Sequence, residues 1–224
     1  EDAIAEGINV NVTLLFARSA YADVAQAWLE GLEQWAAKGG DPARVASVAS
    51  FFVSRIDAAM DAEISQRLSG AGESQHAALS ALLGQVAIAN AKLAYADYKR
   101  LIAQSRWQAL AQRGAQPQRL LWASTGTKNP AYRDVIYVEA LLGPQTVNTV
   151  PPATLDAFRD HGVAQARLIE GLDAAQTVMA QVEQLGLPLT AITDRLVVDG
   201  LKLFADAHDS LLKAVAGKRD ALLK

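Results

Sequence analysis

The chain of 224 residues contains no cysteine, which excludes disulfides, thiolate metal sites and cysteine nucleophiles. Histidine is scarce, and the three that occur are far apart without the spacing of metal ligands, so we predict no metal site. No apolar run is long enough to cross a bilayer, and no stretch resembles a signal peptide. We therefore expect a cytoplasmic protein without a membrane partner.

An excess of positive charge is also lacking, because 21 Lys and Arg residues stand against 24 Asp and Glu residues. The formal net charge of −3 gives no support for a nucleic-acid partner. The composition is that of a globular protein, with 51% hydrophobic and 20% charged residues. A chain of this length can build one sizeable core, so we predict a single domain over residues 1–224.

The stretch INVNVTLLF, residues 8–16, alternates with a period of two. Asn9, Asn11 and Thr13 fall on one face together with Leu15, and apolar residues fill the other face. In a parallel barrel the apolar face would lie against the surrounding helices. The polar face would then point into the barrel, where side chains near the carboxyl ends of the strands form the active site.

Strands and helices alternate along the chain. We predict strands at residues 8–16, 46–53, 119–124 and 146–150. Helical patterns cover roughly residues 21–35, 58–69, 76–104, 133–142, 154–162, 163–185, 188–207 and 208–222. Short strands with intervening helices imply parallel pairing through right-handed crossovers. Because an eight-unit barrel typically needs about 250 residues, four units with extra helices fit half of a larger barrel.

Four segments, in this order, resemble bacterial transaldolases: INVNVTLLF, SFFVSRID, LLWASTGTKNP and TVNTVPPATLDAFRDHG. The resemblance covers essentially the whole chain. It implies an α/β fold of the parallel (β/α)8 barrel family, of which this chain is the carboxyl-terminal portion, about the last four β/α units plus extra helices. It also implies a pentose phosphate pathway enzyme that moves a dihydroxyacetone unit between sugar phosphates through a lysine Schiff base, without a metal or organic cofactor.

The Schiff-base lysine of this family lies on the strand before the INVNVTLLF segment, so the resemblance places it upstream of Glu1. We therefore expect the chain to be part of a longer protein and to be inactive alone. We also expect it to form a homodimer or to associate with the missing amino-terminal half, because an open barrel edge needs a cover. Two alternatives stay open: a fructose 6-phosphate aldolase-like lyase, and a non-catalytic half-barrel with a partner.

The resemblance assigns catalytic roles to Asn11, Thr13 and Ser50. Asn11 and Thr13 match a polar pair on the strand next to the lysine, and Ser50 matches a serine that contacts substrate hydroxyls. Such a mechanism needs rigidly held donors and acceptors around the Schiff base. Asn is depleted in strand interiors, which favours a functional role for Asn11 over a merely tolerated polar residue.

Phe52 and Arg55 belong to the SFFVSR segment, and the resemblance implies that Phe52 shapes the pocket and Arg55 binds the substrate phosphate. A guanidinium suits this role because its planar fork meets phosphate oxygens in pairs. The alternatives are core packing for Phe52 and an ion pair to Asp57 or Asp61 for Arg55. The segment departs from the family at two positions: Phe51 stands where the family has proline, and Ser54 stands where it has glycine.

Ser124 and Lys128 follow the third predicted strand and match a substrate-binding loop of the family. Many transaldolases carry an arginine where this chain has Gly126, and we predict that Lys128 supplies the second positive charge for the phosphate. A role for Lys128 as the Schiff-base lysine is disfavoured, because water keeps the amine of a loop lysine protonated. We also predict that Asn148 lies on the inner face of the fourth strand.

Overall fold

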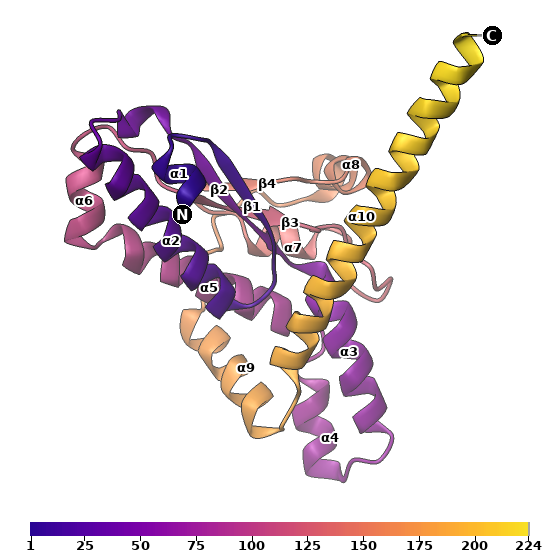
Figure 1. The fold of residues 1–224 in the computed structure, drawn as a ribbon. Coiled ribbons are helices and arrows are strands. Elements are labelled where there is room, and N and C mark those ends of the chain that lie inside the picture. Colours follow the sequence, from indigo (N-terminus) through magenta and orange to yellow (C-terminus); the bar gives the residue numbers. More distant parts are fainter. Residues whose placement is uncertain (224) are drawn as a thin grey trace.

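The computed structural model describes residues 1–223, and Figure 1 shows their arrangement. The strands are β1 Val10–Leu15, β2 Ser47–Phe52, β3 Arg119–Ala123 and β4 Thr146–Asn148. They form one sheet in the order β1-β2-β3-β4, and each neighbouring pair is parallel. The predicted strands and their parallel pairing are confirmed. The fold is α/β and consistent with the parallel-barrel family.

Helices connect the strands and extend beyond them. Their bounds are α1 Asp2–Ala5, α2 Arg18–Ala37, η1 Pro42–Arg44, α3 Ser54–Leu68, α4 Glu73–Ser80, α5 Val86–Ile102, α6 Ser105–Ala111, α7 Ile136–Ala140, α8 Pro152–His161, α9 Leu172–Gln184 and α10 Leu189–Leu222. The connection from β1 to β2 runs through α2, that from β2 to β3 through α3 to α6, and that from β3 to β4 through α7. Each parallel pair is therefore joined by a helical crossover, as the alternation predicted.

The main core lies between helices α2, α3 and α5 and one face of the sheet. Phe51 of β2 and Trp122 of β3 are register partners on this face, with ring centroids 6.2 Å apart in a T-shaped contact. Tyr21 of α2 packs edge-on against Phe51, at 6.4 Å. Because side chains alternate along a strand, Ser50 and Phe52 point to the opposite face of the sheet.

The predicted helix over residues 76–104 is broken in the structure. Helix α4 ends at Ser80 and α5 begins at Val86, and Gly84 between them has a φ of +68°. Residues with a side chain rarely adopt this conformation. The apolar stripe continues across the break, with Leu79, Leu82 and Val86 all buried, so the periodicity alone did not reveal it.

Other helix boundaries also differ from the prediction. The segment predicted as a helix over residues 163–185 becomes helical only at Leu172, after Gly171 with a φ of +65°. The two helices predicted over residues 188–207 and 208–222 are the single helix α10. Helix α6 was not predicted.

Helix α10 packs against the body of the protein only along its first part, where Ile192, Thr193 and Gly200 are buried. A Cβ atom at Gly200 would lie 2.7 Å from the Leu14 side chain, so the helix crosses close to the end of β1. Beyond that point α10 projects away from the body (Figure 1) and exposes large apolar residues, among them Leu201, Phe204, Leu211, Val215 and Leu222. None of the described helices is long and apolar enough to cross a membrane.

Candidate active site

Asn11 of β1 and Ser50 of β2 lie together on the face of the sheet opposite the core. The Ser50 hydroxyl donates a hydrogen bond of 2.7 Å to the Asn11 amide oxygen. Ser50 is 3% exposed, whereas Asn11 and Thr13 are both exposed. The bond fixes the Asn11 side chain through its oxygen and leaves the NH2 group as a donor for a ligand.

Arg55 lies in the first turn of α3, directly after β2, and its guanidinium carbon lies 5.2 Å from the centroid of the Phe52 ring. This cation–π contact holds the side chain beside the aromatic ring. The Phe52 ring in turn packs at 5.1 Å from that of Phe16. The alternative of an ion pair from Arg55 to Asp57 or Asp61 is wrong, because the described residues include no such pair, and both carboxylates bind other groups instead.

Ser124 follows β3 with a φ of +56°, and its Oγ lies 3.0 Å from the Oγ of Ser54. The amide of Ser54 also donates to the Ser124 carbonyl, at 3.0 Å. The next hydroxyl, that of Thr125, donates to the Asn148 side-chain oxygen at 2.8 Å. Asn148 is the register partner of Trp122, which lies on the core face, so the predicted inner-face position of Asn148 is wrong. These contacts tie together the carboxyl ends of β2, β3 and β4.

Lys128 lies in the loop after β3 and lines a hollow of about 300 Å³ beside α3. The polar side chains that line the same hollow are those of Ser54, Asp57, Asp61, Ser65, Asn129, Tyr132 and Tyr137. The Lys128 side chain is exposed. Arg55 and Lys128 thus follow the carboxyl ends of the neighbouring strands β2 and β3, and their joint binding of one phosphate stays a prediction.

Asp57 of α3 is buried, whereas the sequence suggested it only as an ion-pair partner of Arg55. Its carboxylate accepts hydrogen bonds from the Ala87 amide at 2.8 Å and from the Tyr137 hydroxyl at 2.9 Å. Burial raises the pKa of Asp57 to about 6, although both hydrogen bonds oppose the rise. Burial also raises the pKa of Tyr137, and the neighbouring Asp57 carboxylate adds to this effect. Through its two hydrogen bonds the Asp57 side chain therefore links α3 to α5 and α7.

The sequence did contain a pattern that predicts this burial. Asp57 and Asp61 are one helical turn apart, so they lie on the same side of α3. Each directly follows a residue of the buried apolar stripe formed by Ile56, Met60 and Ile64. These two carboxylates border the apolar stripe, and no basic residue lies one helical turn from them to form an ion pair. Such a pattern indicates buried hydrogen-bond acceptors and not a solvated helix face.

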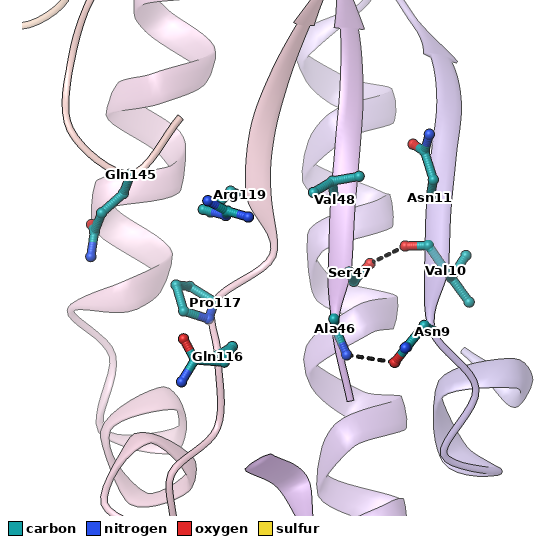
Figure 2. A pocket seen from close by; sticks show the side chains of 10 residues that line it. All are labelled: Asn9, Val10, Asn11, Ala46, Ser47, Val48, Gln116, Pro117, Arg119 and Gln145. Atoms are coloured by element: carbon teal, nitrogen blue, oxygen red, sulfur yellow. Dashed lines mark hydrogen bonds between the residues drawn. The ribbon is translucent and has the colours of Figure 1, made fainter. Parts of the chain in front are cut away.

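A larger hollow, of about 600 Å³, lies at the opposite end of the sheet, where the strands begin (Figure 2). There the Asn9 side-chain oxygen accepts a hydrogen bond from the Ala46 amide, and the Ser47 hydroxyl donates to the Val10 carbonyl, both at 2.7 Å. These polar groups tie the starts of β1 and β2 to each other, and Arg119 lines the same hollow from β3. Because parallel barrels place their reactive groups at the carboxyl ends of the strands, we take the carboxyl-end residues as the candidate active site.

The family model described as transaldolase/fructose-6-phosphate aldolase matches residues 1–215. The chain belongs to this family. The resemblance to transaldolases that the four sequence segments indicated is thereby confirmed.

Similar proteins are named transaldolase over nearly the whole chain. The "Transaldolase" of Trichodesmium erythraeum (strain IMS101) is 47% identical over 218 residues, which are 96% of this chain and 57% of that protein. "Transaldolase 2" of Nostoc sp. (strain PCC 7120) is 46% identical over 97% of this chain and 58% of its own length. The "Transaldolase" of Thermobifida fusca (strain YX) is 46% identical over 96% of this chain and 56% of its own length. The chain thus spans little more than half the length of these relatives.

Proposed function

We propose that the protein containing this chain is a transaldolase, which transfers a dihydroxyacetone unit through a Schiff base in the pentose phosphate pathway. Sedoheptulose 7-phosphate and glyceraldehyde 3-phosphate would give erythrose 4-phosphate and fructose 6-phosphate. The observation that carries the proposal is the 47% identity to the Trichodesmium erythraeum transaldolase across 96% of the chain. A cytoplasmic location and the lack of a metal or organic cofactor belong to the same proposal.

Asn11, Thr13 and Ser50 would surround the reacting carbon atoms. The NH2 group of Asn11 is a donor for a substrate hydroxyl, and the Ser50 hydroxyl keeps that amide in one orientation. Thr13 would add a hydroxyl from the same strand, two residues along and thus on the same face. Donors held rigidly before the substrate arrives reduce the reorganisation that the reaction requires.

Four residues would bind the rest of the substrate. Arg55 would bind the phosphate with its planar guanidinium, which the Phe52 ring supports from one side. Lys128 would add a second positive charge from the neighbouring loop. Ser124 would place a hydroxyl between them, since its Oγ already lies 3.0 Å from that of Ser54 at the start of α3.

The chain alone would not catalyse the transfer, because cleavage of a carbon–carbon bond next to a carbonyl requires an electron sink, which in the proposed mechanism is a protonated Schiff base on a lysine. The described strands contain no lysine. The ammonium of Lys38 donates to the Ala5 carbonyl, that of Lys92 donates to the Arg167 carbonyl, and Lys128 is exposed. Incubation of the chain with fructose 6-phosphate and borohydride should therefore leave its intact mass unchanged. One stoichiometric adduct, mapped to Lys128, would overturn this part of the proposal.

The chain would form the carboxyl-terminal portion of a barrel. Strands β1 and β4 are the outer strands of the described sheet, and a parallel sheet with open edges tends to recruit a cover. We propose that an amino-terminal half, or a second copy of this chain in a homodimer, supplies it. Sedimentation of the purified chain would contradict this if it showed a stable monomer at every concentration.

A fructose 6-phosphate aldolase-like lyase is the second candidate, and the family description favours it to the extent that it names both activities. The two activities differ in their need for an acceptor. A transaldolase passes the dihydroxyacetone unit to an aldose phosphate, whereas a lyase releases it to water as free dihydroxyacetone.

The proposal is tested with a hybrid enzyme in which this chain replaces the matching segment of the Trichodesmium erythraeum transaldolase. With fructose 6-phosphate and erythrose 4-phosphate together, we expect the hybrid enzyme to form sedoheptulose 7-phosphate and glyceraldehyde 3-phosphate. Equal cleavage with and without erythrose 4-phosphate would favour the lyase. A folded hybrid enzyme that turns over neither mixture would contradict both activities.

A further inference from the structure

The loop that carries Lys128 spans residues 124–135, and we refer to it as the Lys128 loop; its ends bind other elements through Ser124, Thr125, Arg133 and Asp134, and its middle is folded largely upon itself. The Thr127 hydroxyl donates to the Arg133 carbonyl at 3.1 Å. The Asn129 side chain accepts from the Ala131 amide at 3.0 Å. These bonds give the loop its shape, but they do not fix its position relative to the sheet.

One side chain anchors the middle of the Lys128 loop to the rest of the protein. The Tyr132 hydroxyl donates to a carboxylate oxygen of Asp61 over 2.7 Å. Within the described part of the chain, this is the one hydrogen bond that joins residues 126–132 to a residue outside the loop. The middle of the loop, which includes Lys128, is thus held from outside by the contact between Tyr132 and Asp61, whereas Thr125 and Arg133 hold its two ends.

Asp61 is itself held in place. Its other carboxylate oxygen accepts a hydrogen bond of 3.1 Å from the Gly84 amide, and its exposed fraction is 9%. The Tyr132 ring lies directly against Gly84, since a Cβ atom there would come within 2.8 Å of the ring. Asp61 and Gly84 thus form a fixed seat for Tyr132.

This seat also sets the distance between the two cationic side chains at the carboxyl ends of the strands. Asp61 belongs to α3, the same rigid helix that carries Arg55 in its first turn. A hydrogen bond from Tyr132 to Asp61 therefore fixes the Lys128 loop relative to Arg55.

We propose that Asp61, acting through Tyr132, positions Lys128 so that its ammonium group and the Arg55 guanidinium bind the same substrate phosphate. The inference rests on the phosphate-binding roles given under the proposed function. A lysine contributes a point charge on a flexible stem, so its share of the binding energy depends on how firmly its backbone is held. Asp61 and Tyr132 are therefore positioning residues, whose effect on the ligand passes through Lys128.

The removal of one hydroxyl isolates this role from the stability of the fold. In Tyr132→Phe the ring stays against Gly84, and the half-exposed position leaves Asp61 within reach of water. Tyr95→Phe is the matched control, because the Tyr95 hydroxyl also makes one hydrogen bond, to the Pro144 carbonyl at 3.1 Å. Both variants lose the same group, but only Tyr132 belongs to the Lys128 loop.

The first experiment measures the dissociation constant of inorganic phosphate for the full 224-residue chain, by NMR titration at constant ionic strength. We expect Tyr132→Phe to weaken phosphate binding about three- to ten-fold and Tyr95→Phe to leave it unchanged. In the Lys128→Ala background the same Tyr132→Phe change should have no further effect, since the two residues act as one unit. In the hybrid enzyme, Tyr132→Phe should raise the KM for fructose 6-phosphate and leave kcat and the KM for phosphate-free fructose unchanged.

Each other outcome overturns a defined part of the inference. An unchanged phosphate affinity in Tyr132→Phe, or losses that multiply in the double variant, would show that Tyr132 does not act through Lys128. An unchanged affinity in Lys128→Ala, or no phosphate binding by the chain, would remove the phosphate role of Lys128 and the inference with it. The proposed transaldolase activity is tested separately, because the turnover of the unmodified hybrid enzyme does not depend on any of these variants.

Discussion

The two ends of the sheet differ in how they use polar side chains. At the amino end, Asn9 and Ser47 bind backbone groups of the neighbouring strand and frame the larger hollow, of about 600 Å³. Farther along the strands, side chains hold other side chains: Ser50 binds Asn11, which also lines the larger hollow, and at the carboxyl end Ser54 binds Ser124 beside a hollow of about 300 Å³. We expect the chemistry at the carboxyl end, because parallel barrels place their reactive groups there.

The carboxyl end also contains Asp57, whose carboxyl pKa is raised well above its ordinary value by burial. Asp57 is 1% exposed and holds α5 and α7 against α3 through two hydrogen bonds. Charged groups are costly to bury, and they persist where their hydrogen bonds are needed. If this comparison is right, equivalent substitutions at the two ends should have unequal effects.

The largest difference in stability is expected between Asp57→Ala and Asn9→Ala. Asp57→Ala leaves the Ala87 amide and the Tyr137 hydroxyl buried without a partner, which should lower the free energy of unfolding by about 4 kcal/mol. Asn9→Ala removes one exposed hydrogen bond to the Ala46 amide and should cost less than about 1 kcal/mol. Urea denaturation of both variants measures the difference, and equal losses would contradict the comparison.

Gly84→Ala should have the next largest effect. Its φ of +68° strains any residue with a Cβ atom, and that atom would lie 2.8 Å from the Tyr132 ring, so we expect a loss of about 3 kcal/mol. Gly39→Ala is the control, because Gly39 has a φ of +86° but no atom within 4 Å of the added Cβ. It should lose about 1 kcal/mol from strain alone. A Gly84 variant no less stable than the Gly39 variant would show that Tyr132 is not seated there.

The pH dependence of stability should separate Asp57 from an ordinary carboxylate. Because its pKa is raised to about 6 in the folded protein, the folded state binds a proton more tightly than the unfolded chain does. The resulting stabilisation is complete below the ordinary pKa of aspartate and is lost as the pH rises through 6. Between pH 4 and pH 7 the loss should be on the order of 2 kcal/mol. In Asp57→Asn this component should vanish, and identical pH profiles of the two proteins would contradict the pKa shift.

Local patterns were enough to predict the sheet and part of the site. The alternation in residues 8–16 separated Asn11 and Thr13 from the apolar face, and the same rule placed Ser50 and Phe52 together. The alternation holds up to Val12, because a period of two is a property of the strand itself. The register then shifts between Val12 and Leu15, so Leu15, expected on the polar face, is the partner of Phe51 on the core face. The common face of Asn11 and Ser50 follows from the sequence, and the hydrogen bond between them agrees with it.

The features that were missed depend on contacts between distant residues. Asp57 and Tyr137 are 80 positions apart, and neither residue alone indicates the other. The helix is interrupted at Gly84 although the apolar stripe continues past it. The interruption reflects the close contact of Gly84 with the Tyr132 ring, which is distant in the sequence. For Asn148 the prediction failed because the three residues of β4 are too few for a period of two to define its faces.

The central claim is that sugar phosphates bind at the carboxyl end of the sheet, and a pair of arginine variants tests it most directly. Arg55 lies at that end, and Arg119 lines the larger hollow at the amino end. In the hybrid enzyme, Arg55→Ala should raise the KM for fructose 6-phosphate about ten-fold with kcat nearly unchanged, because phosphate binding is largely equal in the ground and transition states. Arg119→Ala should leave both constants unchanged. If Arg119→Ala raises the KM and Arg55→Ala does not, the substrate binds at the other end of the sheet and the account is wrong.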